Sequence, residues 1–487
     1  MTLNMAARSS HRYQPAATDA LLIDLADYVA NTPIHRAEAY QAAAWCLMDA
    51  IACMLMASSY PACTQLLGPS VPGATLATGA RVPATDYCLE PVQAAFNIGC
   101  LIRWLDFNDT WLAAEWGHPS DNLGSILAIS DYLSRQRLAQ GKPAILLNAV
   151  FTAMIKAYDI QGVLALENSF NRVGLDHVLL VKIASTAVVS DILGANQQQI
   201  INAISNAFMD GGCLRAYRHA PLTGTRKSWA AGDACRRAVQ LALMALQGDM
   251  GYRTVLSTQN WGFCDVLLEG KRLQLSQPLG STVIENILFK INYPAEFHAQ
   301  TAVEAAVKLY PQVKDRIAEI SWIQIETQQP ALRVIHKTAK LQNPADRDHC
   351  LQYMVAVALL TGQLSADNYE DLFAQDERID QLRAKMQLKE NPQFSQDYLD
   401  PEKRSIANSI QIFFQDNSFT RKVLVEFPLG HKRRRREAMP LLRDKFEQAV
   451  STHLSGKKAA GILRIFASSD ILTQTPVNEM MALLAKQ

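Results

Sequence analysis

Paired cysteines are absent from this sequence of 487 residues, although the chain contains nine cysteines. Each one stands singly within an apolar stretch, and no CxxC spacing occurs. Isolated cysteines of this kind are typical of small buried side chains in a reducing compartment. Iron–sulfur clusters are held by clustered cysteines, so the sequence predicts a protein without such a cluster.

A strong net charge and a long uncharged apolar run are also absent. The formal net charge is +1, so no global field attracts nucleic acid or an anionic membrane. The most apolar stretch, 42–58, contains Asp49 and is too short to span a bilayer. Residues 1–20 lack a continuous apolar core, which argues against a secretory signal or an anchor. We therefore expect a cytoplasmic protein that binds neither nucleic acid nor membrane.

One short run is strongly basic, HKRRRR at 431–436. Such runs occur in proteins that bind nucleic acid. Because the chain as a whole is close to neutral and contains no recognisable nucleic-acid-binding module, we interpret this run as a solvated turn at a domain edge.

The spacing of apolar residues predicts a mainly α protein with a large all-helical domain and an inserted α+β lid domain. A first helix follows Thr18 and Asp19 and ends at 31–33. Further helices are expected at 36–58, 92–104, 122–137, 145–166, 177–192, 198–210 and 228–247.

The pattern changes near Gly270, where residues typical of strands begin to alternate with helical segments. Strands are expected at 272–275, 320–326, 406–414 and 421–427, and helices at 299–309 and 346–362. We assign residues 1–269 and 437–487 to the helical domain and residues 270–436 to the lid domain.

The most unusual local feature is the segment 104–122, WLDFNDTWLAAEWGHPSDN. Two apolar helices flank it, so its carboxylates and its imidazole are expected to pack beside indole rings. Burying such groups is unfavourable unless they are paired or functional. A helix-capping network would explain any single residue, but binding and catalytic groups concentrate on loops of this kind.

A second segment, RAYRHAPLTGTRK at 215–227, follows a Gly-Gly pair and ends at the start of a helix. Its arginines and lysine, together with the free amides of a helix N-terminus, could neutralise several carboxylates. The alternative is a solvated basic loop. The lysine and glycine spacing of a phosphate-binding P-loop is missing.

Two other segments offer polar groups near the expected domain junction. YPAEFH at 293–298 leads into a helix with Glu296 and His298, and DRDHCLQY at 346–353 opens another. Acidic residues at a helix start favour its dipole, and a single histidine such as His349 is more often structural than catalytic. These segments by themselves do not decide a function.

Taken in order, several blocks resemble the MmgE/PrpD family from about residue 20 to the C-terminal PVN segment at 476–478. They are LDFNDTW (105–111), WGHPS (116–120), NSFNRVGLDH (168–177), GTRKSWAAG (224–232), PAEFH (294–298) and NPADRDH (343–349). The resemblance implies a helical domain plus an α+β lid, a homodimer, no metal or other cofactor, and an active site between the domains. It further implies dehydration of the small tricarboxylate 2-methylcitrate, with citrate as a second candidate substrate.

The family's active-site positions carry over to matching residues of these blocks. The resemblance places in the site Asp106, Thr110, His118, His177, Lys227, Tyr353 and either Glu296 or His298. The match is weaker at His177, because the preceding residues differ, and at the PAEFH block, where the family's histidine has two possible counterparts.

The expected chemistry assigns roles to these residues. Loss of a weakly acidic proton next to a carboxylate needs a positioned base and nearby cations. We predict His118 as the base, with a pKa near neutrality, and Asp106 as the group that orients it. Arg218 and Arg226 are the candidates that hold substrate carboxylates together with Lys227.

The proton donor for the departing hydroxyl stays open among Lys227, His177 and Tyr353, and Thr110, Glu296 and His298 are expected to contact the substrate. Decarboxylation of cis-aconitate or an epimerase reaction in the same cleft is the alternative activity. A non-enzymatic binding protein with a basic patch is a remote one.

Overall fold

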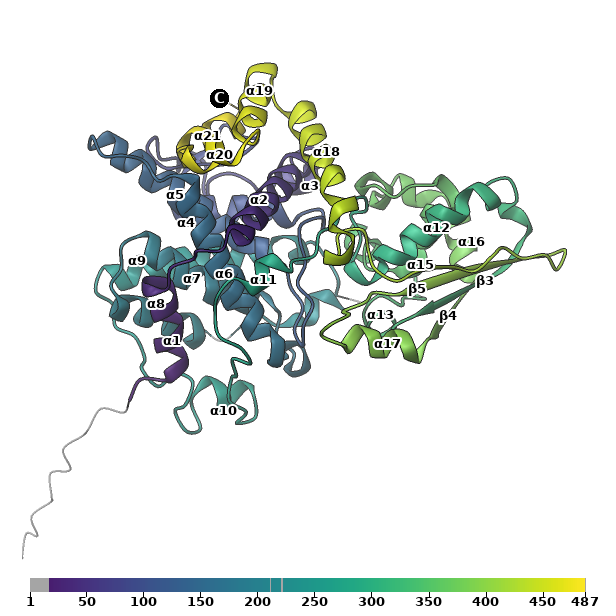
Figure 1. Cartoon of the computed structure of the whole chain (residues 1–487), viewed down its shortest axis with the longest axis horizontal. Coiled ribbons are helices and arrows are strands. Elements are labelled where there is room, and N and C mark those ends of the chain that lie inside the picture. The colour runs from purple at the N-terminus through teal and green to yellow at the C-terminus, as the bar shows by residue number, and fades with distance from the viewer. Residues whose placement is uncertain (1–16, 211, 220–221, 487) are drawn as a thin grey trace, which may run out of the picture.

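Two hydrophobic cores organise the chain in the computed structural model, which describes residues 17–210, 212–219 and 222–486 (Figure 1). The first core contains helices from both the N-terminal and the C-terminal parts of the chain. The second contains residues between Ala295 and Val425. Val283 and Ile291 still pack in the first core, so the change from one core to the other falls between Ile291 and Ala295.

Helices predicted from apolar spacing are confirmed in the first part of the chain. They are α1 (Ala20–Asn31), α2 (Ala37–Ala57), α4 (Pro91–Arg103), α5 (Leu123–Ala139), α6 (Leu147–Glu167), α7 (Val178–Ile192), α8 (Gln197–Met209) and α9 (Arg226–Leu246). Helices α6 and α7 are buried along nearly their whole length, which fits their apolar character on all sides. They form the centre of the helical domain.

Glycine brings α4 and α9 unusually close together. A Cβ atom on Gly99 would lie 2.6 Å from the Cα atom of Gly232, and one on Gly232 would lie 2.5 Å from the carbonyl oxygen of Phe96. Only glycine permits this approach. The end of α4, at Arg103, therefore lies beside the first turn of α9, which contains Lys227.

The lid domain is built on a four-stranded mixed sheet in the order β4–β3–β5–β6. The strands are β3 (Ile320–Thr327), β4 (Met386–Glu390), β5 (Asn408–Phe414) and β6 (Val423–Val425). Strand β4 pairs parallel to β3, and the other pairs are antiparallel. Helix α12 (Gln300–Val313) packs on β5 and β6, and α15 (Leu351–Thr361) packs against α12. Helix α13 (Gln329–Val334) contacts β4 and α17 (Pro392–Leu399), and its Ala331 is buried in the same core as α12 and α15.

Three details of the lid prediction are wrong. Residues 272–275 do not form a strand, because the backbone N–H of Gln274 donates to the side chain of Asn168 and no strand of the described residues pairs with them. Strand β4 was not predicted, since most of its residues are polar or exposed at the sheet edge. The helix expected at 346–362 is broken into α14 (Pro344–Arg347) and α15, and Asp348 and His349 lie in the break.

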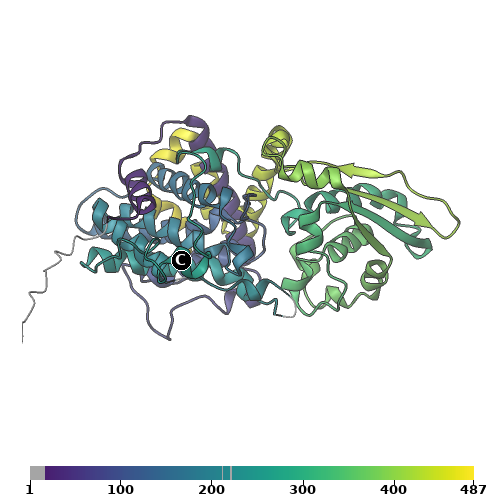
Figure 2. The same ribbon diagram turned by 90° about the horizontal axis from the view of Figure 1, so that it is seen from below.

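After the lid, the chain returns to the helical domain through α18 (Arg435–His453), α19 (Gly456–Ile465), α20 (Ser469–Gln474) and α21 (Val477–Leu484). Helix α18 packs on α2, and α21 packs on α5. Both views show the lid on one side of the helical domain, with the N-terminal end of the described part on the other (Figures 1 and 2). The predicted architecture, mainly α with an inserted α+β lid, is confirmed.

The basic run at 431–436 is only partly the solvated turn that the sequence predicted. Lys432, Arg433 and Arg436 are exposed, but His431 is buried. Arg434 donates to Glu304 of the lid at 2.8 Å, and Arg435 donates to the carbonyl oxygen of Ile287 at 2.8 Å. We call Arg434, Arg435 and these partners the basic junction, because they tie the lid to the helical domain.

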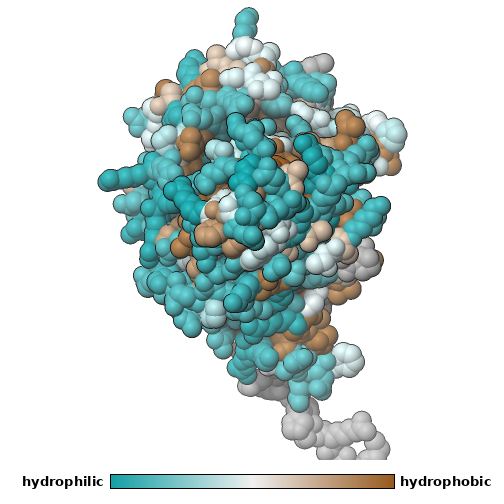
Figure 3. Space-filling view, turned by 90° about the vertical axis from the view of Figure 1, so that its right-hand side faces the viewer, coloured by the Kyte–Doolittle hydropathy of each residue, from teal (hydrophilic) through white to brown (hydrophobic). Residues whose placement is uncertain are grey.

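Two helices, α2 and α6, are long and apolar enough to cross a membrane by composition alone. In the structure, 72% and 83% of their most apolar windows are buried inside the protein, as expected for core helices. The outer end of the lid domain presents a mostly hydrophilic surface with scattered apolar residues (Figure 3).

Candidate active site

Asp106 lies at the centre of a buried group of charges between the two domains. It follows α4 in the left-handed backbone region, with φ of +49°, and its side chain is almost completely buried. Arg103 donates to its Oδ1 at 2.6 Å, and Lys290 donates to the same atom at 2.5 Å and to the backbone carbonyl at 2.6 Å. Burial alone would raise the pKa of Asp106, but Arg103, Lys290 and Lys227 hold it well below its usual range.

The lid contributes a carboxylate and an imidazole to the same group. Lys227 donates to both oxygens of Asp348 at 2.5 Å, and its Nζ lies 4.0 Å from Oδ2 of Asp106. Nδ1 of His349 lies 2.8 Å from Oδ1 of Asp348 and 3.2 Å from Nζ of Lys227. We call these residues the Asp106 cluster: Arg103, Asp106, Lys227, Lys290, Asp348 and His349.

Three members of this cluster have a spacing that could hold a metal ion: Asp106, Asp348 and His349. The ammonium of Lys227 contacts Asp348 and His349 directly and lies near Asp106. The cation needed to balance these ligand atoms is thus supplied by the chain itself, and its charge would repel a metal ion placed beside it. This donor set therefore does not fit a metal site.

His118 begins the short helix η1 (Pro119–Asn122) and contacts the cluster from the helical domain. Its Nδ1 donates to the carbonyl oxygen of Asp109 at 2.6 Å, and its Nε2 accepts from Arg103 at 2.9 Å. Burial first, and then Arg103, lower the pKa of His118 well below 6.5. The predicted pKa near neutrality is therefore wrong, because a guanidinium rather than a carboxylate contacts Nε2.

Asp109 and its neighbours support the loop that contains His118. Asp109 accepts from the backbone and the hydroxyl of Ser120 at 3.0 and 2.7 Å and from the hydroxyl of Tyr158 at 2.6 Å. Thr110 lies beside His118, with its hydroxyl 3.3 Å from Nδ1. The LDFNDTW block thus combines one carboxylate at the site with another that fixes the loop.

The segment 215–227 contributes a second cationic group. Nε of Arg218 donates to Asp176 at 2.5 Å, and Arg215 lies 3.6 Å from Asp176 and 3.8 Å from Glu115. Burial would raise the pKa of Asp176, but the neighbouring cations, Arg218 foremost, lower it strongly. Burial raises the pKa of Glu115 to about 7. Nη1 of Arg215 is buried and has no hydrogen-bond partner among the described residues.

The lid also contributes Glu296, which caps the short helix η4 (Phe297–Ala299) and accepts from the backbone N–H of His298 at 2.8 Å. Nδ1 of His298 lies 2.7 Å from Glu296, and its Nε2 lies 3.2 Å from the hydroxyl of Tyr398. Burial would raise the pKa of Glu296, but His298 lowers it. Both nitrogens of His298 are thus engaged within the lid.

A small cavity of about 30 Å³ lies among these groups. Its wall contains four cationic side chains, Arg103, Arg215, Arg218 and Lys290, against two carboxylates, Asp106 and Glu296. The other polar wall residues are Thr110, His118, His177, His219 and His349. The excess of cations favours an anionic ligand.

Most of the residues predicted for the site meet at this cavity. Asp106, Thr110, His118, His177, Arg218 and Glu296 line it, and Lys227 lies directly behind His349 and Asp106. Nδ1 of His177 is sealed from solvent without a hydrogen-bond partner among the described residues, and burial lowers its pKa well below 6.5.

Three predicted residues lie away from the cavity wall. Arg226 stacks on Trp229, with its guanidinium carbon 4.3 Å from the ring centre, and its side chain is 37% exposed. The hydroxyl of Tyr353 donates to the carbonyl oxygen of Asn368 at 2.7 Å within the lid core. His298 packs behind Glu296.

Sequence reasoning did not identify Arg103, Lys290 and His349 as wall residues, and it predicted Arg215 only as one of several cations in the segment 215–227. Arg103 and Lys290 are single cations at the ends of apolar segments, so neither shows a local pattern. The sequence does contain a signal for His349, because the DRDH segment places a carboxylate directly before its imidazole.

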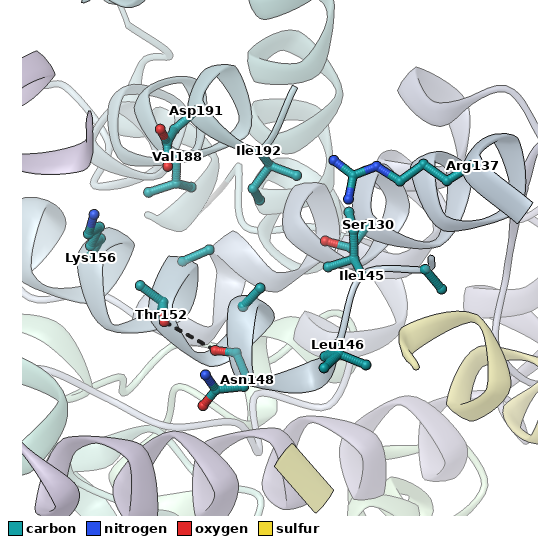
Figure 4. Close-up of a pocket in the computed structure, with 13 residues that line it drawn as sticks. Ser130, Arg137, Ile145, Leu146, Asn148, Thr152, Lys156, Val188, Asp191 and Ile192 are labelled. Atoms are coloured by element: carbon teal, nitrogen blue, oxygen red, sulfur yellow. Dashed lines mark hydrogen bonds between the residues drawn. The ribbon is translucent and has the colours of Figure 1, made fainter. Parts of the chain in front are cut away.

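A roomier cavity of about 510 Å³ lies elsewhere, between α5, α6 and α7 (Figure 4). Apolar side chains such as Ile145, Val188 and Ile192 form much of its wall. Its buried lysine, Lys156, already donates to the carbonyl oxygen of Val29 at 2.6 Å. One exposed guanidinium, that of Arg137, cannot neutralise several carboxylates, so this cavity does not suit a polyanionic substrate.

The fold and the site together define an enzyme with a cation-rich cavity between a helical domain and an inserted lid. Family models described as the MmgE/PrpD N-terminal domain and the MmgE/PrpD C-terminal domain match residues 23–276 and 293–471. The chain belongs to the MmgE/PrpD family.

Several relatives are similar over almost the whole chain. The 2-methylcitrate dehydratase of Escherichia coli K12 is 55% identical over 468 residues, which cover 96% of this chain and 97% of that protein. The 2-methylcitrate dehydratase of Cupriavidus necator is 54% identical over 470 residues, with the same coverage. The mitochondrial 2-methylcitrate dehydratase of Yarrowia lipolytica is 49% identical over 477 residues, which cover 96% and 91%.

Proposed function

We propose that this chain is a hydro-lyase that converts 2-methylcitrate to 2-methylaconitate. The observation that carries this proposal is the cation-rich wall of the interdomain cavity, in a chain that is 55% identical along nearly its full length to 2-methylcitrate dehydratases. A substrate with three carboxylates needs several buried cations at once. The wall supplies Arg103, Arg215, Arg218 and Lys290.

The reaction also explains why these cations surround a carboxylate and imidazoles. Removal of a proton next to a carboxylate places negative charge on that group in the transition state. Cations held in a water-poor cavity stabilise this charge strongly, because they are already oriented when it develops. Arg103 and Lys290 are fixed by Asp106, and Arg218 is fixed by Asp176. Lys227 adds positive charge from behind the wall.

Substrate binding requires the cavity to enlarge. Its volume of about 30 Å³ holds little more than one water molecule, whereas pockets for small molecules usually measure several hundred cubic ångströms. Asp106 and Lys227 belong to the helical domain and Asp348 and His349 to the lid. We propose that the lid opens to admit substrate and that the observed structure is the closed arrangement.

The deciding experiment incubates chelator-treated protein with 2-methylcitrate and, separately, with citrate. Formation of the conjugated product is followed by its absorbance. We expect undiminished turnover of 2-methylcitrate, since Lys227 supplies the positive charge at the metal-like group of ligands found among the described residues, Asp106, Asp348 and His349. Activity restored only by added iron would contradict a cofactor-free reaction. Release of CO₂ would instead indicate a decarboxylase, and an isomer without unsaturation would indicate an epimerase.

Assembly as a homodimer stays a prediction from the family resemblance, and a cytoplasmic location stays a prediction from the sequence composition. Light scattering coupled to size-exclusion chromatography tests the first. A mass of 53.9 kDa, that of one chain, would contradict it.

A further inference from the structure

The lid domain places one buried imidazole of the cavity wall in an arrangement that the other two buried imidazoles lack. His349 lies in the break between α14 and α15, directly after Asp348. Its Nδ1 lies 2.8 Å from Oδ1 of Asp348. Because an ionised carboxylate can only accept hydrogen bonds, Nδ1 carries a proton and donates to Oδ1. The proton is then absent from Nε2. Nε2 therefore carries the free lone pair of a neutral imidazole.

This lone pair is available to a ligand. Nε2 of His349 forms no hydrogen bond to any described residue, and His349 lines the cavity. By contrast, Nε2 of His118 accepts from Arg103 at 2.9 Å. Nδ1 of His177 is sealed off, and its Nε2 lies 3.8 Å from Asp176. Of the three buried imidazoles in the wall, only that of His349 combines an orienting carboxylate with an open nitrogen.

The surroundings of the pair hold it in place. Asp348 is fixed by Lys227, which donates to both of its oxygens. The charged groups that face His349 are Lys227 from α9, Asp106 from the loop after α4, its neighbour Asp348, and Glu296 from the lid. Burial first, and then Lys227, lower the pKa of His349, so its neutral, basic form prevails at neutral pH.

We infer that His349, oriented by Asp348, is the general base of the dehydration, and that closure of the lid delivers it to the substrate. This inference rests on the proposed function. Nε2 takes the proton next to a substrate carboxylate, and the electron pair of that C–H bond becomes the carbon–carbon double bond. The C–O bond breaks, and hydroxide leaves with its electron pair. The imidazolium returns the proton to this hydroxide, which gives water and neutral His349.

The arrangement also assigns Lys227 and Asp348 as positioning residues. A carboxylate behind an imidazole fixes its tautomer and stabilises the imidazolium that forms, as in other acid–base pairs in enzymes. Because Lys227 belongs to the helical domain, the pair is complete only when the lid is closed. Proton removal is thereby confined to the closed enzyme, from which bulk water is excluded.

The test compares full-length wild-type protein with His349→Ala, His349→Gln, His118→Ala and, as a control, His336→Gln, an exposed histidine of the lid. For both His349 variants we expect kcat to fall by about two to four orders of magnitude, the usual contribution of a general base. The dissociation constant of 2-methylcitrate, measured by calorimetry, should change little. Added imidazole should raise kcat of His349→Ala in a saturable manner and should not rescue His118→Ala. The control should match the wild type.

A substrate carrying deuterium at the carbon that loses its proton gives a second measurement. In His349→Gln, proton removal becomes the slowest step, so kcat should show a full primary isotope effect. Asp348→Asn should lower kcat with unchanged substrate affinity, and imidazole should not rescue it, because the His349 ring still fills the site.

Three results would overturn the assignment: kcat of folded His349→Gln close to that of the wild type, imidazole rescue of His118→Ala in place of His349→Ala, or loss of substrate affinity as the main defect of both His349 variants. Failure of the wild type to dehydrate 2-methylcitrate is a separate outcome, since it rejects the proposed function itself.

Discussion

The lid meets the helical domain at two groups of charges that are built differently. In the Asp106 cluster, the side chains of Asp106 and Lys227 are only 2% and 1% exposed, and each contacts several partners. In the basic junction, Arg434 is 21% exposed, and its second partner, Glu437, is 56% exposed. Water can replace a partner at the junction but not in the cluster. The comparison separates a dry group of charges beside the cavity from a partly solvated contact between the two domains.

The largest loss of stability should follow the removal of one charge from the Asp106 cluster. Replacing Asp106 by Asn leaves Arg103, Lys290 and Lys227 buried with one carboxylate fewer. Removing one partner of a buried group of charges typically lowers the free energy of unfolding by about 3–5 kcal/mol. Urea unfolding of the variant measures this loss. A loss no larger than at an exposed ion pair would show that the cluster is hydrated.

Removal of Lys227 from the cluster should lower activity strongly. We expect Lys227→Ala to lower kcat/KM by at least about a hundredfold, since it loses a buried cation near the developing charge and the support of Asp348. The matched control is Lys432→Ala, an exposed lysine beside the junction, which should stay within about threefold of the wild type. A folded Lys227→Ala variant that also stays within this range would exclude Lys227 from the site.

Replacing His118 by Gln should have a smaller effect on stability, and this effect should depend on pH. Its pKa in the folded state lies below the unfolded value near 6.5, so the unfolded chain binds more protons as pH falls below 6.5. Each pH unit in this window then costs the wild type about 1.4 kcal/mol of stability, a loss that His118→Gln avoids.

The destabilisation caused by His118→Gln should therefore shrink when pH is lowered from 7 to about 5.5. Urea unfolding at several pH values measures it, and His336→Gln, exposed in the lid, should show no such trend. A constant difference between variant and wild type would mean that His118 titrates normally.

The smallest effect is expected at the basic junction. Glu304 accepts from Arg434 at 2.8 Å and pairs with the exposed Lys308. Both side chains of the Arg434–Glu304 pair are partly buried, so replacing Glu304 by Gln should lower the free energy of unfolding by about 1 kcal/mol, the upper end for solvent-accessible ion pairs. A loss as large as that of Asp106→Asn would remove the distinction between the two groups.

Periodic and block-like features of the sequence predicted most of the fold. Helices such as α6 and α7 repeat apolar residues over several turns, so their bounds were close to those observed. Strand β4 escaped prediction because an edge strand needs few apolar residues, and its partner β3 lies some sixty positions earlier in the chain. The break before α15 contains no helix-breaking residue that the sequence could reveal. It exists because Asp348 and His349 are held there by contacts across the domains.

The site was predictable where its residues are neighbours in sequence and not where they converge in space. Arg226 and Lys227 are adjacent, but consecutive helix residues point about 100° apart, so only one can face the Asp106 cluster. Tyr353 follows His349 by one helical turn and instead packs into the lid core. Arg103 and Lys290 reach Asp106 only through the folded backbone.

Lys445 belongs to neither group of charges and connects the site to helix α18 in the C-terminal part of the chain. Lys445 of α18 donates to the carbonyl oxygens of Phe107 and Lys290 at 3.0 Å and to Asp49 at 2.7 Å. It thus holds the backbone of two segments that carry Asp106 and Lys290. The ribosome synthesises the chain from its N-terminus, so Arg103, Asp106, Lys227 and Lys290 emerge before Asp348 and Lys445. A ribosome-bound chain therefore holds Arg103, Lys227 and Lys290 against the single carboxylate of Asp106 until Asp348 of the lid has emerged.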